Sequence, residues 1–488
     1  MIDKREILDL ATRMSLIPHV VEKDYVLGWI LAGINANSAL RDSWVFKGGT
    51  CLKKCYFETY RFSEDLDFTL IDPAQIDEAF LRSTFAEIGD WVYENTGIEM
   101  PADKQEFDIY RNPRGTVSCQ GKLSYRGPVS SRDLPRVKLD LTADERLVLP
   151  PARTTVFHPY TDAPDPGIEI LAYVYEEVFA EKVRALAERT RPRDLFDVIN
   201  LFRNADARPS PAVMLDVIGQ KCDFKGIGVP VLGDLDPHRV ELEGLWKSML
   251  GHQLPSLPPY ESFWDELPAF FEWLAGGVTP NEPAAYTMGA GETVLRERVL
   301  RLPVSGQIQS MIEVIRFAAA NRLVVELDYD GAARRIESYS LRQTRDGNVI
   351  LHAFDVDKAG HRSYRIDRFQ GARVTNTSFV PRYEIELTPK GPVRVGATSA
   401  RVSQTPFRVR SARATRAASS PWTTKARANP FTKPAKTKAF GQPTYIYQCP
   451  MCQKKFRRST MDGKLNAHKN EWGGNCSGRT GYLVDTKY

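Results

Sequence analysis

The sequence predicts a multidomain protein built on an α/β (α+β) core. Three observations support this fold class. Helix and strand patterns alternate through the first third of the chain, short strands separated by Gly turns follow residue 306, and four Cys and His residues gather near the end. A chain of 488 residues is long enough for three or so domains. We expect an α/β core at 1–160, a helical domain completing its site at 161–300, a small β-barrel at 301–386, a basic flexible linker at 387–444 and a cysteine-containing module at 445–488.

The expected elements follow from hydrophobic periodicity and turn residues. A 3.6-residue period predicts helices, and alternation of apolar with polar residues predicts strands. A proline-rich stretch between residues 150 and 167 is expected to be a connection. We expect helices over 5–36, 51–57, 73–96, 176–186 and 308–320, and strands over 44–46, 63–70, parts of 105–141, 168–174 and several segments between 323 and 369.

Composition indicates where the protein acts. The charged start, Met1–Glu6, does not resemble a secretory signal, and no apolar run approaches 18 residues, so we expect no membrane contact. Seven cysteines are an odd number, and four of them are scattered in apolar or mixed surroundings. This usage suits a reducing compartment rather than a disulfide framework, so we expect a cytoplasmic protein.

The net charge of +5 conceals a strong asymmetry along the chain. Residues 387–461 contain 16 Lys and Arg and no acidic residue, and the last 27 residues add a charge of +1. Residues 1–386 therefore carry −12. An acidic body followed by a basic arm predicts that the arm contacts a polyanion such as nucleic acid.

A strand, a Gly turn, a helix and a second strand are expected to follow one another between residues 44 and 70. Gly48 and Gly49 stand in the turn, where the lack of side chains lets backbone N–H groups and a helix N-terminus approach a triphosphate. Taken alone, a Gly pair is more often a plain turn. Combined with the acidic strand that follows, it predicts a phosphate cradle facing a metal site.

Three acidic residues are candidates for that metal site. Asp65 and Asp67 fall two residues apart on one strand face, where two carboxylates repel one another unless a cation is present. Mg²⁺ (or Mn²⁺) bridging substrate phosphates suits such all-oxygen ligands. Asp140, on the strand 136–141, is the candidate third carboxylate, which would complete the metal shell or activate an attacking hydroxyl. The alternative is that these acids lie on solvated strand edges.

Lys182 is a candidate for the same site. It falls in the apolar stripe of a predicted helix, at helical spacing from Val178 and Leu186, so its ammonium should face inward. A cation that faces inward needs an anionic partner, and carboxylates with a triphosphate would supply one. The alternative is a surface helix held by ion pairs between its own acidic and basic residues.

Two strings of residues resemble one known family. Gly48-Gly49-Thr50-x-Leu52, followed by Arg61-x-Ser63-x-Asp65-x-Asp67, resembles the AbiEii/AbiGii toxin family of nucleotidyltransferases. Ala180-Glu181-Lys182, followed by Arg191-x-Arg193-Asp194-Leu195-Phe196-Asp197, is similar to the later motifs of that family. The resemblance covers roughly residues 15–280 and implies a nucleotidyltransferase core.

The resemblance also implies residue roles. Lys182 and Asp197 would belong to the active site, with Asp194 as the second choice for the carboxylate. Asp65 and Asp67 would hold the metal, and the nucleotide would contact Gly48, Gly49, Thr50, Arg61 and Ser63. The family implies an NTP substrate, a toxin-like or phage-defence role, and a partner antitoxin or defence-system protein. In some members the acceptor is the 3′ end of tRNA.

The predicted barrel resembles a second family. Residues 329–375 are similar to a WYL domain, a ligand- or nucleic-acid-sensing module with an SH3-like barrel. The naming Trp-Tyr-Leu triplet is replaced by Val349-Ile350-Leu351, whereas Arg365-Ile366-Asp367-Arg368 is kept. The resemblance implies that Arg365 and Arg368 line a binding surface. A purely structural barrel is the alternative.

The tail carries a candidate zinc finger. Cys449 and Cys452 are followed by His468 and then Cys476, which gives four N/S ligands for a structural, tetrahedral Zn²⁺. A segment of 44 residues has little other means of holding a fold. Unrelated cysteines in a disordered tail are the alternative.

Two functions remain open at this point. The first is a Mg²⁺-dependent nucleotidyltransferase that moves NMP from an NTP to an acceptor, with tRNA or DNA bound by the basic arm. The second is a WYL and zinc-finger nucleic-acid-binding sensor or regulator whose transferase fold is degenerate. The intact Asp65, Asp67 and Lys182 argue against degeneracy.

Overall fold

A computed structural model describes most of the chain, in two compact units that span residues 1–401 and 402–488. The described residues are 1–14, 16–57, 61–112, 114–129, 133–277, 283–286, 291–296, 306–387, 444–449, 452, 454–458, 464–469, 476 and 482–487. The expected linker at 387–444 lies almost wholly outside them. Each unit is described by itself.

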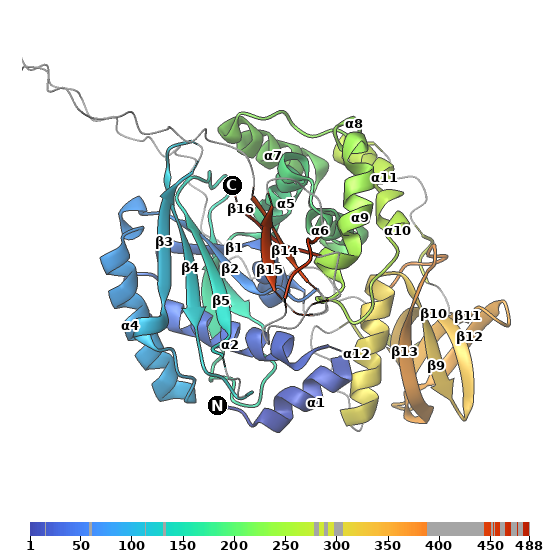
Figure 1. The fold of residues 1–488 in the computed structure, drawn as a ribbon. Coiled ribbons are helices and arrows are strands. Elements are labelled where there is room, and N and C mark those ends of the chain that lie inside the picture. Colours follow the sequence, from blue (N-terminus) through green and yellow to red (C-terminus); the bar gives the residue numbers. More distant parts are fainter. Residues whose placement is uncertain are drawn as a thin grey trace, which may run out of the picture. The chain divides into compact units, whose positions relative to one another are not determined.

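A seven-stranded mixed sheet forms the centre of the first unit (Figure 1). Its order is β3-β4-β5-β2-β1-β7-β6, and the pairs β2–β5 and β1–β7 are parallel while the others are antiparallel. The strands are β1 (Trp44–Lys47), β2 (Asp65–Leu70), β3 (Glu106–Arg111), β4 (Val117–Ser124), β5 (Arg136–Thr142), β6 (Ala152–Val156) and β7 (Ile168–Ala172). Strands β1 and β2, which flank the Gly turn, carry buried apolar residues and lie in the middle of this sheet.

Helices α2 (Pro18–Ala36) and α4 (Glu78–Thr96) pack against the sheet and against each other. Phe85 of α4 lies against Trp44 of β1, with ring centroids 6.0 Å apart. Asp77 begins α4 because its side chain accepts a hydrogen bond from the Phe80 amide, and Gly97 ends it in a left-handed conformation. The α/β core expected from the sequence is confirmed.

Three expectations about elements are wrong. The single helix over 5–36 is two helices, α1 (Lys4–Met14) and α2, because Pro18 cannot continue a helix and Ile17 is extended. The helix after the Gly turn starts at Gly48 as α3 (Gly48–Cys51) and continues as a π-helical turn over Leu52–Tyr56. The proline-rich connection contains the strand β6. Pairing with β7 stabilises this strand, which the sequence pattern did not predict.

A helical layer follows the sheet in sequence. It comprises α5 (Tyr175–Arg189), α6 (Pro192–Arg203), α7 (Pro211–Lys225), α8 (Leu232–Leu235), α9 (Arg239–Leu250), α10 (Glu261–Trp264) and α11 (Leu267–Leu274). Its aromatic residues form the core between these helices: Phe196 stacks on Phe263 at 5.1 Å, and Trp246 lies 5.2 Å from Phe263. These aromatic residues therefore form a hydrophobic core rather than a ligand-binding site.

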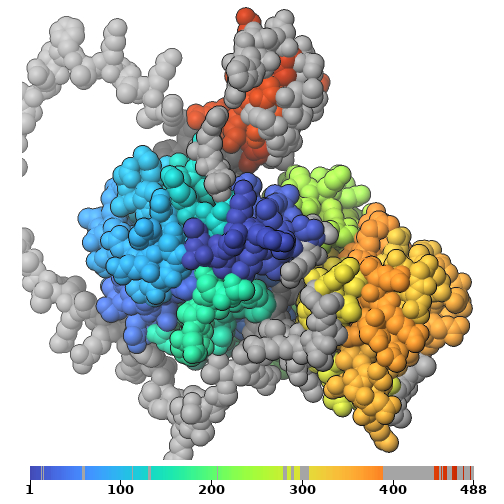
Figure 2. All heavy atoms as spheres, turned by 90° about the horizontal axis from the view of Figure 1, so that it is seen from below, coloured from blue at the N-terminus to red at the C-terminus, as the bar shows by residue number. Residues whose placement is uncertain are grey.

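Residues 306–387 form a second, antiparallel sheet covered by α12 (Gly306–Ala320). Its main path is β12-β11-β10-β9-β13, which leaves β12 and β13 at the edges, and the short β8 (Thr293–Val294) pairs with β10. The strands are β9 (Leu323–Tyr329), β10 (Ala332–Gln343), β11 (Val349–Asp355), β12 (Gly360–Arg365) and β13 (Phe369–Ser378). Helix α12 also touches α1, and the space-filling view shows the yellow and orange module beside the dark blue N-terminal segment (Figure 2).

The second unit contains a three-stranded sheet in the order β15-β14-β16, from β14 (Thr444–Gln448), β15 (Lys455–Arg458) and β16 (Tyr482–Lys487). Among its described residues, Tyr447, Cys449, Leu465 and Cys476 form a buried cluster, with Phe456 packed against it. Within the described parts of the whole chain, every helix is too short or too polar to cross a bilayer.

Candidate active site

The register of the first sheet brings the predicted acidic residues to adjacent strands. Asp67 on β2 is paired with Asp140 on the parallel β5 and with Lys47 on the antiparallel β1. Asp65, at the start of β2, is paired with Lys138. The strand pairing thus assembles one acidic and basic surface from segments that are about 70 residues apart in sequence.

Asp65 and Asp67 lie in an environment that disfavours their negative charge. Burial raises the pKa of both carboxyl groups, and the neighbouring charge raises it further: that of Asp67 acts on Asp65, and that of Asp140 acts on Asp67. Among the described residues, none donates a hydrogen bond to either carboxylate or lies within ion-pair distance of it. Such a pair is stabilised by a bound cation, so these two residues fit a Mg²⁺ site of one or two carboxylates completed by substrate phosphates.

Asp140 lies beside Asp67 but has a partner on its own strand. The Lys138 ammonium is 2.7 Å from Asp140 Oδ2; Lys138 is exposed and Asp140 is half-buried. In the described part of the chain, the three aspartates do not form a group of ligand atoms close enough to share one ion. Asp140 is therefore placed next to Asp67, on the adjacent strand.

Gly48 is required by both conformation and space. Its φ of +82° lies in the left-handed region, and a Cβ there would be 2.2 Å from Asp67 Oδ2. A Cβ on Gly49 would be 2.7 Å from Arg61 Nη2 and 3.2 Å from Ser63 Oγ. The Gly pair thus lets the backbone approach the acidic strand closely, and it places Ser63 near the turn.

Thr50 and Arg61 make contacts within the protein. The Thr50 hydroxyl donates to the carbonyl of Asp65, which ties the short helix to the acidic strand. The buried Arg61 guanidinium donates from Nε and Nη2 to the two oxygens of Asp197, at 2.7 and 2.8 Å. These two candidates therefore hold the site together in the structure, whatever they contact when a nucleotide is bound.

Lys182, Asp194 and Asp197 form one buried network. Lys182 Nζ lies 2.7 Å from Asp197 Oδ2 and 3.7 Å from Asp194 Oδ1, and Arg189 donates two bonds of 2.8 Å to Asp194. Burial would raise the pKa of Asp197, but the charges of Arg61 and Lys182 outweigh it and hold that pKa far below the usual range. The inward-facing lysine is confirmed, and its anionic partners come from α6.

The ion pairs that the surface-helix alternative predicts for α5 also exist, but their residues line a cavity beside the acidic strand. Arg184 contacts Glu181 at 3.4 Å and also pairs with Glu188, as the alternative interpretation of α5 required. Arg184 is nevertheless buried, and it reaches Glu145 in the loop after β5 as well. The charged face of α5 therefore lines the site instead of facing bulk solvent.

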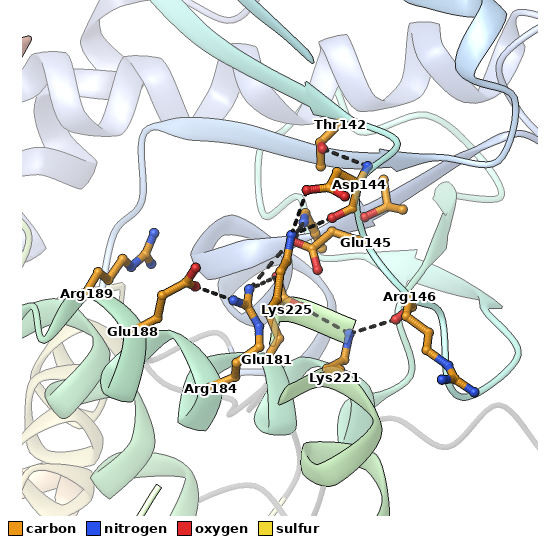
Figure 3. Close-up of polar contacts among 12 residues, drawn as sticks. Thr142, Asp144, Glu145, Arg146, Glu181, Arg184, Glu188, Arg189, Lys221 and Lys225 are labelled. Carbon is orange, nitrogen blue, oxygen red and sulfur yellow. Dashed lines mark hydrogen bonds and ion pairs between the residues drawn. The ribbon is translucent and has the colours of Figure 1, made fainter. Parts of the chain in front are cut away.

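Sequence reasoning missed most of the residues that line this cavity. The polar contacts of several of them, among them Glu145, Arg184 and Lys225, are drawn in Figure 3. The cavity has a volume of about 280 Å³ and adjoins the acidic strand. Its lining consists of Lys47, Gly48, Asp67, Glu145, Glu181, Lys182, Arg184, Ala185, Glu188, Arg189 and Lys225. One sequence signal was available: Lys221 follows Met214, Val217 and Ile218 at helical spacing in the apolar stripe of α7, just as Lys182 does in α5.

Lys221 and Glu177 support the cavity wall from behind. Lys221 Nζ lies 2.7 Å from Glu177 Oε1 and 3.1 Å from Glu181 Oε2, and it donates to the Arg146 carbonyl. Glu177 in turn accepts bonds from the amides of Val148 and Leu149. The loop after β5 is therefore fastened to both α5 and α7.

In the second sheet, Arg365 and Arg368 are exposed and paired locally. Arg365 donates to Asp367 at 3.1 and 2.7 Å, and Arg368 Nη1 lies 3.3 Å from Asp330 Oδ2. Both guanidinium groups remain accessible to a ligand at the surface.

The tail brings its four predicted ligands together. The ligand atoms of Cys449, Cys452, His468 and Cys476 all lie within 4.8 Å of one another. Cys449 Sγ is 3.7 Å from Cys476 Sγ, close to the ~3.8 Å edge of a tetrahedron with Zn–S bonds of about 2.3 Å. Cys452 Sγ lies 3.3 Å from His468 Nε2. The donor set and its spacing fit zinc.

One comparison with known proteins, a family model, agrees with this geometry. Residues 29–275 match the family model described as nucleotidyl transferase AbiEii toxin, type IV TA system. No curated protein matches the sequence. Two solved structures show weak likeness: MenT4, a nucleotidyltransferase toxin from Mycobacterium tuberculosis H37Rv (16% identity, TM-score 0.37, 56% of this chain and 90% of that one), and proteasome accessory factor B/C of Arthrobacter aurescens (13% identity, TM-score 0.16, 58% and 64%).

With TM-scores this low, neither structure adds an argument about this chain. The family model covers half of the sequence and includes β1, β2, β5, α5 and α6, which carry the acidic pair, the Gly turn and the buried lysine. The chain therefore belongs to the AbiEii family of nucleotidyltransferase toxins.

Proposed function

We propose that the protein transfers NMP from an NTP to a nucleic-acid acceptor, with Mg²⁺ or Mn²⁺ held by Asp65 and Asp67. The observation that carries this proposal is the pair of half-buried carboxylates that have no ion-pair partner among the described residues and adjoin a cavity lined by both basic and acidic side chains. A bound metal would neutralise negative charge on the phosphates and would lower the barrier to attack on them by the acceptor.

The chain's own groups would position the substrate. Gly48 and Gly49 let the phosphates approach the backbone, and Ser63 would add a hydroxyl at the same turn. Lys182 is held by Asp197 with its ammonium at the cavity wall, where it would face the phosphates. Asp140, beside Asp67, would accept the proton of the attacking hydroxyl.

The remaining segments would serve recognition. We propose the domain division given above, with residues 301–386 as an SH3-like module of WYL type that binds a ligand near Arg365 and Arg368. The Cys449–Cys476 cluster would hold a structural zinc, and the basic arm would bind tRNA or DNA through its phosphates. An antitoxin or another defence protein is the expected partner, because the family model describes toxins of type IV toxin–antitoxin systems.

Incubation with each α-labelled NTP, Mg²⁺ and total RNA or DNA tests the proposal. We expect one nucleic-acid fraction, such as tRNA, to become labelled by the wild-type protein and not by an Asp65→Asn, Asp67→Asn variant. Asp108→Asn, an exposed carboxylate on β3 of the same sheet, is the matched control and should label as wild type does. Equal labelling by the double variant and the control would contradict the assignment of the metal site.

A further inference from the structure

One carboxylate in the cavity is surrounded by three cations. Glu145 Oε1 lies 3.3 Å from Lys225 Nζ, 3.5 Å from Arg184 Nη2 and 3.6 Å from Lys47 Nζ. The cations come from α7, α5 and the end of β1, and the labelled side chains of Glu145, Arg184 and Lys225 point toward one another in Figure 3. Glu145 itself belongs to the irregular segment between β5 and β6 and is almost fully buried, with 9% of its side chain exposed.

The Glu145 carboxylate is held by charge rather than by hydrogen bonds. In the described part of the chain, no donor meets hydrogen-bond geometry with it, and all three cation distances exceed 3.2 Å. Its neighbour Asp144 is fixed differently, because it accepts bonds from Asn112 and from Lys225. The backbone of this loop is thus anchored on both sides, whereas the Glu145 side chain can leave its place without breaking a directed bond.

Three cations from separate elements converge on one oxygen, and each also has a second acidic partner: Glu181 for Lys47 and Arg184, and Asp144 for Lys225. A phosphate group offers more oxygens and more charge than a carboxylate, and Lys and Arg bind it strongly. The same cavity is lined by Asp67 and Lys182, so the site adjoins the residues assigned to metal and nucleotide.

We propose that Lys47, Arg184 and Lys225 form a subsite for the pyrophosphate part of the NTP, and that Glu145 occupies this subsite until the phosphates displace it. The inference rests on the proposed function, because pyrophosphate is the group that NMP transfer releases. Glu145 would then act as an internal competitor, and every phosphate ligand would bind less tightly by the cost of displacing it.

This competition has a measurable sign. Replacing Glu145 with Gln keeps the shape of the side chain and removes its charge. The side chain should then no longer occupy the subsite most of the time, so pyrophosphate should bind about tenfold more tightly to the variant than to the wild type. If Glu145 instead only holds the three cations in position, its loss should leave them repelling one another and should weaken binding or leave it unchanged.

The test is calorimetric titration of inorganic pyrophosphate into the full-length protein without divalent metal. Glu145→Gln should bind about tenfold more tightly. Glu106→Gln, which removes an exposed carboxylate paired with Lys122 on the same sheet, should match the wild type. Lys225→Met should bind more weakly than the wild type and should abolish most of the gain when combined with Glu145→Gln.

Two results would overturn the inference: unchanged or weaker binding by Glu145→Gln, or wild-type affinity in Lys225→Met. The second holds even where Glu145→Gln fails to fold. Pyrophosphate binding needs neither an acceptor nor turnover, so the two proposals can fail separately. Tighter binding by Glu145→Gln in a protein that transfers no NMP would contradict only the proposed function, and transfer with unchanged affinity would contradict only the subsite.

Discussion

Asp197→Asn should separate the scaffolding carboxylates of this site from its metal-binding ones. The Asp197 side chain is buried, accepts two charge-assisted hydrogen bonds from Arg61 at 2.7 and 2.8 Å, and forms an ion pair with Lys182 at 2.7 Å. Asparagine keeps one oxygen but turns an NH₂ group toward a cation. The substitution therefore leaves two buried positive charges without their anion.

The expected loss of stability is large. Removing one partner of a buried ion pair costs about 3–5 kcal/mol, which is a sizeable share of the roughly 5–15 kcal/mol that stabilises a typical domain. Asp65→Asn is the matched comparison, because burial and the charge of Asp67 raise the pKa of Asp65 and its ionised form is disfavoured in the fold. Asp65→Asn should therefore be neutral or stabilising. Both variants should lose transfer activity.

Urea denaturation followed by tryptophan fluorescence measures the difference. Two results would refute the network as the support of Lys182. One is a urea midpoint for Asp197→Asn close to that of the wild type, and the other is a decrease in midpoint smaller than the decrease seen for Asp65→Asn. The pH dependence gives a second check. Because the folded-state pKa of Asp197 is depressed, its contribution is present above the unfolded pKa of about 4 and is lost as the pH falls through the folded value. The acid loss of stability should be shallower in Asp197→Asn.

Three further predictions follow from other contacts. Gly48→Ala forces a non-glycine residue to a φ of +82° with its Cβ 2.2 Å from Asp67 Oδ2, so activity should fall at least tenfold and the melting temperature should drop; wild-type values for both would contradict the close approach. Arg365→Ala with Arg368→Ala should weaken binding of a nucleotide or single-stranded nucleic acid to the second sheet without changing transfer from saturating NTP, measured by fluorescence anisotropy; unchanged binding would leave the sheet as scaffold. The protein should contain one zinc per chain by elemental analysis and lose it in Cys449→Ser, since about 10 kcal/mol or more of metal binding is available to fold so small a module; absence of zinc from the wild type would contradict the finger.

Local patterns predicted the acidic strand well. Alternation from Ser63 placed Asp65 and Asp67 on one strand, and the structure has them on β2, next to a turn that needs glycine at position 48. The inward orientation of Lys182 followed from its place in an apolar stripe. In each case the information lies within one helix or strand, where periodicity fixes the side of the element that a residue occupies.

Partners that lie far apart in sequence were not predictable in this way. Arg61 and Asp197 are 136 residues apart, and their pairing depends on how α6 packs against the sheet. Glu145 stands in an irregular loop, where no period indicates which side it faces, and Lys225 looks like an ordinary last residue of a helix. Proline at position 18 is a local signal against one continuous helix over 5–36, although the apolar pattern continues on both sides of it.

The central claim is that this protein attaches an NMP group to an acceptor, and the position of the label in the NTP tests it most directly. The acceptor should become radioactive when the wild-type protein is given an NTP labelled at the α-phosphate, and it should stay unlabelled with the same NTP labelled at the γ-phosphate. Loss of the α-label in the Asp65→Asn, Asp67→Asn variant, with Asp108→Asn as active as the wild type, would tie the transfer to the acidic pair. Labelling from the γ-phosphate, or α-labelling that survives the double substitution, would contradict the claim.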